Sequence, residues 1–346
     1  MQKVDLRSDT LTKPTPEMRQ AIFNAQVGDD VFGEDPTINE LQETIADLLG
    51  KEAALFVSSG TMANQIAINC HTNPGEEVIC EAGAHIFNYE AGAPAMLSGV
   101  QIRQIVGNRG VFTADQIKSI LLPANDHYAR QTLVTIENTH NRAGGTVFPL
   151  DEILKIRALL SSAGIKFHMD GARLWNASIA TGIALKTFAA PFDSVSVCLS
   201  KGLGAPVGSL LAGDKTFIAQ ARRYRKAYGG GMRQAGILAA AGLYAVRHHQ
   251  QRLQEDHQRA KKLAQALAQY PGVNIDLDAV QTNILYANFK KTGKVAQKIV
   301  DEFSAHGLYT LATSLNEIRM VTHLDVNDND IDWAIHVFDI VLGEQG

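Results

Sequence analysis

Residues 195–204 hold the feature that most limits how this chain can fold. Apolar residues alternate from Val195 to Leu199 as in a buried strand, and Lys201 then stands in a turn that two glycines keep open. An amine held at a strand end can attack a carbonyl carbon if burial and its neighbours lower its pKa. A lysine after a strand is more often a solvated surface residue, so the interpretation of Lys201 depends on the other strand ends.

Two earlier strand ends carry the partners that such a lysine needs. Residues 165–169 are typical of a buried strand and lead into Asp170, whereas residues 53–57 lead into a Ser-Gly-Thr turn and a helix. A carboxylate can keep a pyridine nitrogen protonated, and a lysine can carry pyridoxal phosphate as a Schiff base. Backbone N–H groups at a helix start suit a phosphate dianion. The phosphate cup, pyridine partner and lysine, in this order, predict a pyridoxal phosphate site.

Short segments with further characteristic residues follow one another along the chain. They are DLRSDT (5–10), GDDVFG (28–33), ENTHN (137–141), HMDGAR (168–173), LSKGLG (199–204), GGGMRQ (229–234) and RMVTHLD (319–325). With them, the sequence resembles the low-specificity L-threonine aldolases, which belong to the fold-type I group of pyridoxal phosphate enzymes. The resemblance runs nearly end to end and is weakest between about Lys261 and Asn316.

The expected fold class is α/β. The resemblance to fold-type I, transferase-like enzymes implies a large domain with a mostly parallel central sheet flanked by helices, and a smaller α+β C-terminal domain. The alternation of strand and helix patterns agrees with this and ends near residue 247. We expect an N-terminal arm over residues 1–15, a large cofactor-binding domain over 16–247 and a small C-terminal domain over 248–346.

The resemblance implies reversible retro-aldol cleavage of L-threonine, L-allo-threonine and related L-3-hydroxy-2-amino acids to glycine and an aldehyde. Such an enzyme is a carbon–carbon lyase of threonine catabolism and glycine biosynthesis. Two other reactions of the same cofactor group, β-elimination and transamination, stay open because they would share Asp170 and Lys201. From a different class, a cofactor-free Schiff-base aldolase and a noncatalytic ligand-binding protein also stay open.

The resemblance also assigns roles to individual residues. The expected catalytic residues are Lys201, Asp170, His85 and His127. His85 would stack on the pyridine ring, and His127 would lie near the substrate side chain. Without the resemblance, His85 would more often be a structural hydrogen-bonding residue and His127 a surface residue. The base that takes the β-hydroxyl proton is left open between His85, His127 and a water that they position.

The cofactor and the substrate have overlapping sets of expected contacts. The cofactor-binding residues are Ser59, Gly60, Thr61, His85, Asn138, Asp170, Arg173, Ser200, Lys201 and Arg233. The substrate-binding residues are Ser8, His85, His127, Arg173 and Arg319. Arg173 would grip the substrate carboxylate, because a bidentate guanidinium fixes its orientation, and Arg319 and Ser8 would help. Phe32 stands where many members of the family carry tyrosine, so a hydroxyl group is missing there.

The resemblance implies a homo-oligomer, with a homodimer as the smallest active unit and a homotetramer as the expected assembly. Arg233 and the three glycines before it would complete the site of the neighbouring subunit. The sequence itself does not distinguish dimers from tetramers.

Composition excludes several other classes of protein. The 346 residues are 45% hydrophobic and 20% charged, and the formal net charge of −4 gives no basis for nucleic-acid binding. The sequence shows no apolar leader and no run of about 18 apolar residues, so we expect a cytoplasmic protein without membrane contact. The three cysteines lack CxxC spacing and His140 has no partner at metal-like spacing, so we expect neither a disulfide framework nor a metal site.

Overall fold

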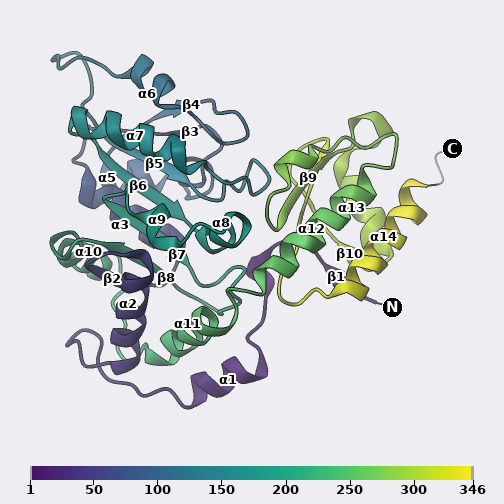
Figure 1. Ribbon diagram of the computed structural model, residues 1–346, viewed down its shortest axis with the longest axis horizontal. Helices are drawn as coiled ribbons and strands as arrows, with labels where there is room; N and C mark the ends of the chain where they lie inside the picture. Colours follow the sequence, from purple (N-terminus) through teal and green to yellow (C-terminus); the bar gives the residue numbers. More distant parts are fainter. Residues whose placement is uncertain (1, 344–346) are drawn as a thin grey trace.

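The computed structural model describes residues 2–343, which fold into two lobes (Figure 1). The larger lobe is built on a seven-stranded sheet with the strand order β2-β8-β7-β6-β5-β3-β4. Strand β8 runs antiparallel to both of its neighbours, and the other pairs are parallel. The predicted α/β class with a mostly parallel central sheet is confirmed. The strands are β2 (Ala53–Val57), β3 (Glu77–Glu81), β4 (Gln101–Ile105), β5 (Gln131–Glu137), β6 (Lys166–Gly171), β7 (Ser194–Cys198) and β8 (Ser209–Gly213).

Helices cover both faces of this sheet, because successive side chains of a buried strand point to opposite sides. Phe56 packs in one core with Leu41 of α2, whereas its neighbour Leu55 packs on the other face with Ile66 of α3 and Ala221 of α10. The helices of this lobe are α1 (Pro16–Phe23), α2 (Pro36–Leu49), α3 (Gly60–His71), α4 (His85–Asn88), α5 (Ala93–Ser98), α6 (Ala114–Ile120), α7 (Leu150–Ala163), α8 (Leu174–Thr181), α9 (Leu185–Ala189), α10 (Lys215–Ala227) and α11 (Gly236–His248).

The smaller lobe holds a three-stranded antiparallel sheet in the order β11-β12-β9 and three longer helices. Its elements are α12 (Leu253–Leu267), β9 (Ile284–Asn288), α13 (Ala296–Ala305), β10 (Leu308–Tyr309), β11 (Leu311–Ala312), β12 (Glu317–Val321) and α14 (Asp328–Leu342). Short 3-10 helices are η1 (Asp9–Leu11), η2 (Leu277–Ala279) and η3 (Lys290–Thr292). Within residues 2–343, no helix combines the length and the apolar character needed to cross a membrane.

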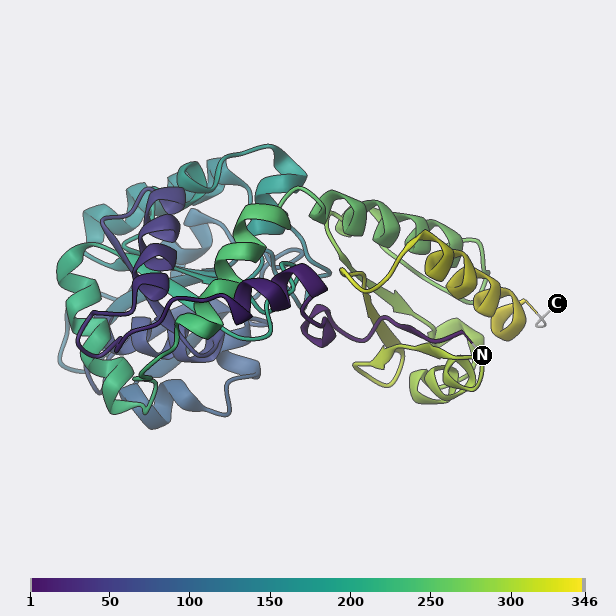
Figure 2. The same ribbon diagram turned by 90° about the horizontal axis from the view of Figure 1, so that it is seen from below.

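The N-terminal segment connects the two lobes. Strand β1 (Val4–Asp5) pairs in parallel with β10, and Val4 and Leu6 are buried in the core of the smaller lobe. The chain then crosses to the larger lobe, where α1 packs against α11 (Figure 2). Ser8 and Asp9 therefore lie on the stretch that passes from one lobe to the other.

The parallel strands of the larger lobe leave the sheet at one edge, and several of them deliver polar residues there. Strand β3 ends at Glu81, β5 ends at Glu137, and Asp170 is the penultimate residue of β6. Lys201 follows β7 by three residues. The carboxyl edge of such a sheet is where α/β proteins bind ligands, so these residues mark the candidate site.

Candidate active site

Asp170 is a buried carboxylate at the carboxyl edge of the sheet. Its backbone lies between Glu137 on β5 and Ser196 on β7 in the strand register. Its Oδ1 accepts a hydrogen bond from the Ala172 N–H at 3.0 Å, and its Oδ2 accepts one from Asn64 Nδ2 at 2.8 Å. Because Asn64 lies on α3, the second bond ties Asp170 to the helix whose start is the expected phosphate cup.

The start of α3 is shaped by a capping residue and a glycine. The Ser59 Oγ accepts the Met62 N–H at 3.1 Å and so caps the helix. A Cβ at Gly60 would lie 2.8 Å from Cys198 Sγ, so the absence of a side chain lets the helix start approach the end of β7. The unpaired N–H groups of this turn and the Thr61 hydroxyl can therefore receive an anion near the strand that leads to the lysine.

Lys201 lies in a turn with a fixed backbone. The Gly204 N–H donates to the Lys201 carbonyl at 2.8 Å. The Trp175 indole N–H donates to the Cys198 carbonyl at 2.9 Å, which holds the end of β7. The Lys201 side chain is half-buried, and its charge acts on the carboxylate of Asp9. The lysine is therefore held at the junction of the two lobes. Ser200 directly precedes it and is also half-buried.

His85 begins α4, shortly after the end of β3. Its backbone N–H donates to Glu137 Oε2 at 2.8 Å, and its Nδ1 lies 2.9 Å from Glu90 Oε1. Burial lowers the pKa of His85, but the hydrogen bond with Glu90 and the negative charges of two further carboxylates outweigh burial and raise the pKa. Sequence reasoning missed both Glu90 and Glu137, although Glu137 opens the segment ENTHN.

Asp9 and Arg173 form a buried ion pair where the lobes meet. Arg173 Nε and Nη2 each donate to an Asp9 oxygen at 2.7 Å, and Asn283 Nδ2 donates to the same carboxylate at 3.2 Å. Burial raises the pKa of Asp9, but the Arg173 charge, helped by Lys201, outweighs it and holds the pKa well below its usual range. Sequence reasoning missed Asp9. The available signal was its place beside Ser8 in the segment DLRSDT.

Arg319 reaches the same junction from β12 of the smaller lobe. The residue is 9% exposed, and its Nε has no hydrogen-bond partner among the described residues. Burial and the charge of nearby Arg173 lower the pKa of the Arg319 guanidinium. Ser8 caps the neighbouring η1, where its Oγ accepts the Thr10 N–H at 3.2 Å. A buried cation beside a second one is costly unless an anion compensates it, so this junction favours an anionic ligand.

Asn138 offers a free donor next to Asp170. Its backbone N–H donates to the Asp170 carbonyl at 2.8 Å, and its Oδ1 accepts the Phe148 N–H at 3.2 Å. Its buried Nδ2 has no partner within residues 2–343. The orphaned amide, the Asp170 carboxylate, the Lys201 amine and the start of α3 together fit pyridoxal phosphate, which needs donors for its oxygens, an acid for its pyridine nitrogen and an amine for its aldehyde.

The structure does not bring His127 to this cluster within one chain. His127 is exposed on the loop that enters β5, whereas the cluster lies where the strands leave the sheet. Tyr128 and Arg130 of this loop line a hollow together with Ile165, which directly precedes β6. The loop is therefore at the opposite edge of the sheet.

Arg233 also lies apart from the cluster. It is exposed and forms an ion pair with Asp29 at 2.9 Å. Next to this pair, Arg225 donates to the Asp30 carboxylate at 2.6 Å and to the Phe56 carbonyl at 2.9 Å. These contacts attach the GDDVFG segment to the helix α10 and to the strand that leads into the α3 start.

Three side chains around Asp170, the expected partner of the pyridine ring, have the spacing of metal ligands. The ligand atoms of His85, Glu90 and Asp170 all lie within 4.8 Å of one another. However, one Asn64 amide group already donates to Asp170 and to Glu90, and the His85 ring faces Glu90. A metal ion would have to replace these hydrogen bonds, so we assign the three residues to a hydrogen-bonded cluster.

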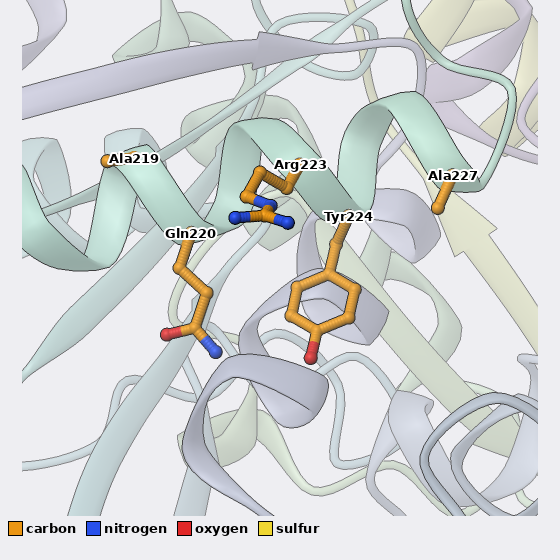
Figure 3. A pocket seen from close by; sticks show the side chains of 5 residues that line it. All are labelled: Ala219, Gln220, Arg223, Tyr224 and Ala227. Carbon is orange, nitrogen blue, oxygen red and sulfur yellow. The ribbon is translucent and has the colours of Figure 1, made fainter.

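One hollow in the surface lies away from the site, and another leads toward it. One runs along α10 and is lined by Ala219, Gln220, Arg223, Tyr224 and Ala227, none of which belongs to the residues described above (Figure 3).

The other hollow lies between the lobes and is lined in part by Arg142, Tyr286 and Glu317. The Arg142 guanidinium lies 5.4 Å from the centre of the Tyr286 ring, and it pairs with Glu317 at 3.4 Å. Tyr286 faces Arg319 across the ladder of β9 and β12. This hollow therefore leads toward the buried arginine.

Comparisons with known proteins agree with one family. The family model described as beta-eliminating lyase matches residues 5–290. The chain is 40% identical over 343 residues to low-specificity L-threonine aldolase 1 of Arabidopsis thaliana, which covers 98% of this chain and 96% of that protein. It is 42% identical over 325 residues to the low specificity L-threonine aldolase of Escherichia coli K12. That match covers 94% of this chain and 95% of the Escherichia coli protein. This chain belongs to the low-specificity L-threonine aldolase family.

A solved threonine aldolase from Leishmania major has the same fold. It matches with a TM-score of 0.83 and 21% sequence identity, and the match covers 97% of this chain and 98% of that chain. The family and the fold type predicted from the sequence are confirmed. In this member of the low-specificity L-threonine aldolase family, the expected lyase site is the cluster at the carboxyl edge of the sheet.

Proposed function

We propose that this enzyme reversibly cleaves L-threonine, L-allo-threonine and related L-3-hydroxy-2-amino acids to glycine and an aldehyde. The names of the relatives from Arabidopsis thaliana and Escherichia coli support this reaction. When bound, pyridoxal phosphate supplies the electron sink that makes cleavage of the Cα–Cβ bond possible. The observation that carries the proposal is the buried, unpaired Arg319 beside a site that combines Asp170 with Lys201.

In this proposal the substrate carboxylate binds between the lobes. The sequence predicts that Arg173 makes the main contact with the carboxylate, but Asp9 already accepts the Nε hydrogen and one of the two Nη2 hydrogens, which leaves the Nη1 hydrogens and one Nη2 hydrogen for a ligand. We therefore assign the carboxylate to Arg173 and Arg319 together, and Ser8 adds a hydroxyl from the segment that crosses between the lobes. Fixing the carboxylate at two points orients the Cα–Cβ bond relative to the ring.

The cofactor contacts proposed for this chain are those that the fold places at the carboxyl edge of the sheet. The turn of Ser59, Gly60 and Thr61 would hold the phosphate, Asp170 would keep the ring nitrogen protonated, and Asn138 would donate to a ring oxygen. Lys201 would form the covalent bond, with Ser200 beside it.

The proton of the β-hydroxyl must be removed as the Cα–Cβ bond breaks. His85 is the candidate that the chain holds next to Asp170, and His127 lies at the opposite edge of the sheet. We therefore assign the base to His85 or to a water that it positions, with His85 also stacking on the ring.

The proposed active unit is a homodimer, and we expect two dimers to form a homotetramer. Supporting this, Phe23 and Phe32 are 82% and 74% exposed on residues 23–32, where apolar side chains would be covered in an assembly. Arg233 would then act on the site of the neighbouring subunit. A cytoplasmic location remains a prediction from the sequence.

Product analysis and covalent trapping test this function together. The enzyme is incubated with pyridoxal phosphate and L-threonine, and glycine, aldehyde, ammonia and 2-oxo acids are measured. Equal amounts of glycine and aldehyde are expected; a 2-oxo acid with ammonia would indicate β-elimination. Borohydride reduction without substrate should attach the cofactor to Lys201, as identified by peptide mapping, and the Lys201→Ala variant should take up no covalent label. A label at another lysine would contradict the assignment.

A further inference from the structure

Glu90 is a buried carboxylate that lies between α4 and α5 and makes three polar side-chain contacts. Asn64 Nδ2 donates to its Oε1 at 2.9 Å, and Gln65 Nε2 donates to its Oε2 at 2.5 Å. The third partner is His85, whose Nδ1 lies 2.9 Å from Oε1. The residue is 2% exposed and pairs with no lysine or arginine among the described residues. Burying a charge is costly unless hydrogen bonds or a nearby opposite charge compensate it.

The orientation of the Asn64 amide is fixed by the groups around its oxygen. Asn64 Oδ1 accepts the Ser196 hydroxyl at 2.9 Å and lies 3.3 Å from His168 Nε2. Burial lowers the pKa of His168 to about 4, so this ring is neutral near pH 7. The two amide hydrogens therefore point the other way, one to Asp170 Oδ2 and one to Glu90 Oε1. One amide group thus connects the two carboxylates.

The same contacts fix the proton on the His85 ring. An ionised Glu90 has only acceptors, and its two oxygens already accept amide hydrogens, so a hydrogen bond at the Oε1 contact needs a hydrogen on His85 Nδ1. The neutral ring must then carry its free lone pair on Nε2. If His85 changed tautomer, a lone pair on Nδ1 would face the carboxylate at hydrogen-bond distance, which is repulsive.

We propose that Glu90 is the positioning residue of His85: it fixes the ring with Nδ1–H, so that Nε2 accepts the β-hydroxyl proton, and Asn64 couples it to Asp170. The inference rests on the proposed function only in what Nε2 does during turnover. The proton moves from the substrate hydroxyl oxygen to Nε2, the electron pair of the O–H bond forms the aldehyde carbonyl, and the electron pair of the broken Cα–Cβ bond stays on Cα, where it would be delocalised into the bound electron sink.

The carboxylates around His85 all stabilise its protonated form. Glu90 faces it from the segment between α4 and α5, Glu137 from the end of β5, and Asp170 from the end of β6; the Tyr89 ring lies 5.6 Å away. Against the effect of burial, these carboxylates raise the pKa of His85. Replacing Glu90 by glutamine removes the negative charge while nearly preserving the shape, so the imidazolium form of His85 becomes less stable.

The test is a nitrogen-15 NMR titration of the histidines in the full-length enzyme without cofactor. In the wild type, His85 should show a protonated Nδ1 and an unprotonated Nε2 above its titration midpoint. In Glu90→Gln the midpoint should move to lower pH. The matched control is Glu81→Gln, because Glu81 Oε2 lies 3.0 Å from Nε2 of the buried His140. This control should change the titration of His140 and leave that of His85 in place.

Two outcomes would overturn the inference. One is an unchanged His85 midpoint in Glu90→Gln, and the other is a wild-type His85 with its hydrogen on Nε2. The second needs no variant, so the inference stays testable even if Glu90→Gln does not fold.

Steady-state kinetics then test the second part of the proposal, which is that Nε2 of His85 accepts the β-hydroxyl proton. In Glu90→Gln, kcat should fall about tenfold or more with little change in KM, and the acidic limb of its pH profile should move to lower pH. Unchanged kcat and pH profile would overturn the role of Nε2. If instead no variant or wild type forms glycine and aldehyde, the proposed function fails, while the NMR result still decides whether Glu90 orients His85.

Discussion

The two halves of the site differ in how completely the chain satisfies their polar groups. Around the expected ring position, Asn64, Glu90 and Asp170 are joined by hydrogen bonds that stay within the larger lobe. Between the lobes, Arg173 is paired with Asp9, but Arg319 is buried with an unpaired Nε. The first half is a preorganised scaffold in which, within residues 2–343, the Asn138 Nδ2 still needs a partner, whereas the buried cation of the second half is compensated only by a ligand. We infer that the first half serves the permanent cofactor and the second serves the substrate that comes and goes.

The largest expected effect lies in the preorganised half. Asp170→Asn removes the negative charge that would keep the ring nitrogen protonated, while the amide can still occupy the same space. We expect kcat to fall by about 100-fold or more, a loss of roughly 2.7 kcal/mol of transition-state stabilisation. Steady-state kinetics with L-threonine measure it, and Asp47→Asn on the exposed face of α2 is the control. A loss of only a few-fold would show that Asp170 is not the partner of the ring.

The buried pair between the lobes should matter most for stability. Asp9→Asn leaves the Arg173 guanidinium buried without its counter-charge, and we expect the free energy of unfolding to fall by about 3 kcal/mol. Urea unfolding of the cofactor-free enzyme measures it. The control is Asp276→Asn, because the Asp276 pair with Arg109 is exposed and should contribute little.

The same pair predicts a pH dependence. Because folding lowers the pKa of Asp9, its contribution is present above the ordinary carboxyl pKa of about 3.9 and is lost as pH falls toward the folded value. The wild type should therefore lose more stability than Asp9→Asn between neutral and acidic pH. Parallel curves for the two proteins would contradict this assignment.

The unpaired arginine should behave in the opposite way. Arg319→Gln removes a buried cation that forms no ion pair with an acidic side chain within residues 2–343, so we expect no loss in the free energy of unfolding. Its effect should fall on binding, with KM for L-threonine rising about 10- to 100-fold as charge-assisted hydrogen bonds are lost. Arg109→Gln, at the exposed rim between the lobes, is the control. An unchanged KM would remove Arg319 from the carboxylate site.

The comparison also shows what a sequence can predict. Asp170 and Lys201 each follow a local apolar run, so strand patterns alone place them at strand ends, and the resemblance adds their roles. The missed contacts connect distant positions: the Asp9 bond to Arg173 spans 164 residues, and the Asn64 bond to Asp170 spans 106. No local pattern encodes such pairs, because they exist only after the sheet and the two lobes have formed.

His127 illustrates a different limit. Its position in the sequence, shortly before β5, resembles the family pattern, and the structure places it at the edge where that parallel strand begins. The direction of a strand could have given this edge from the sequence, because ligand-binding residues in α/β sheets follow the strands. What the sequence could not give is the Glu90 contact that fixes the ring of His85.

The smallest expected effect concerns stereochemistry, where the two halves must act together. The carboxylate clamp and the ring fix the configuration at Cα, because a D-amino acid held by Arg319 would aim its side chain at the wrong face of the cofactor. The configuration at Cβ is detected only through the hydroxyl and one methyl group. A single proton acceptor at His85, or a water beside it, can reach a hydroxyl from two directions, and misplacing a methyl group costs only about 1–3 kcal/mol. L-threonine and L-allo-threonine should therefore both be cleaved, while D-threonine and D-allo-threonine are not. Values of kcat/KM for the four stereoisomers decide this: appreciable cleavage of a D-isomer would contradict the clamp, and cleavage of one L-isomer alone would show that the ring half holds the hydroxyl more tightly than the single acceptor implies.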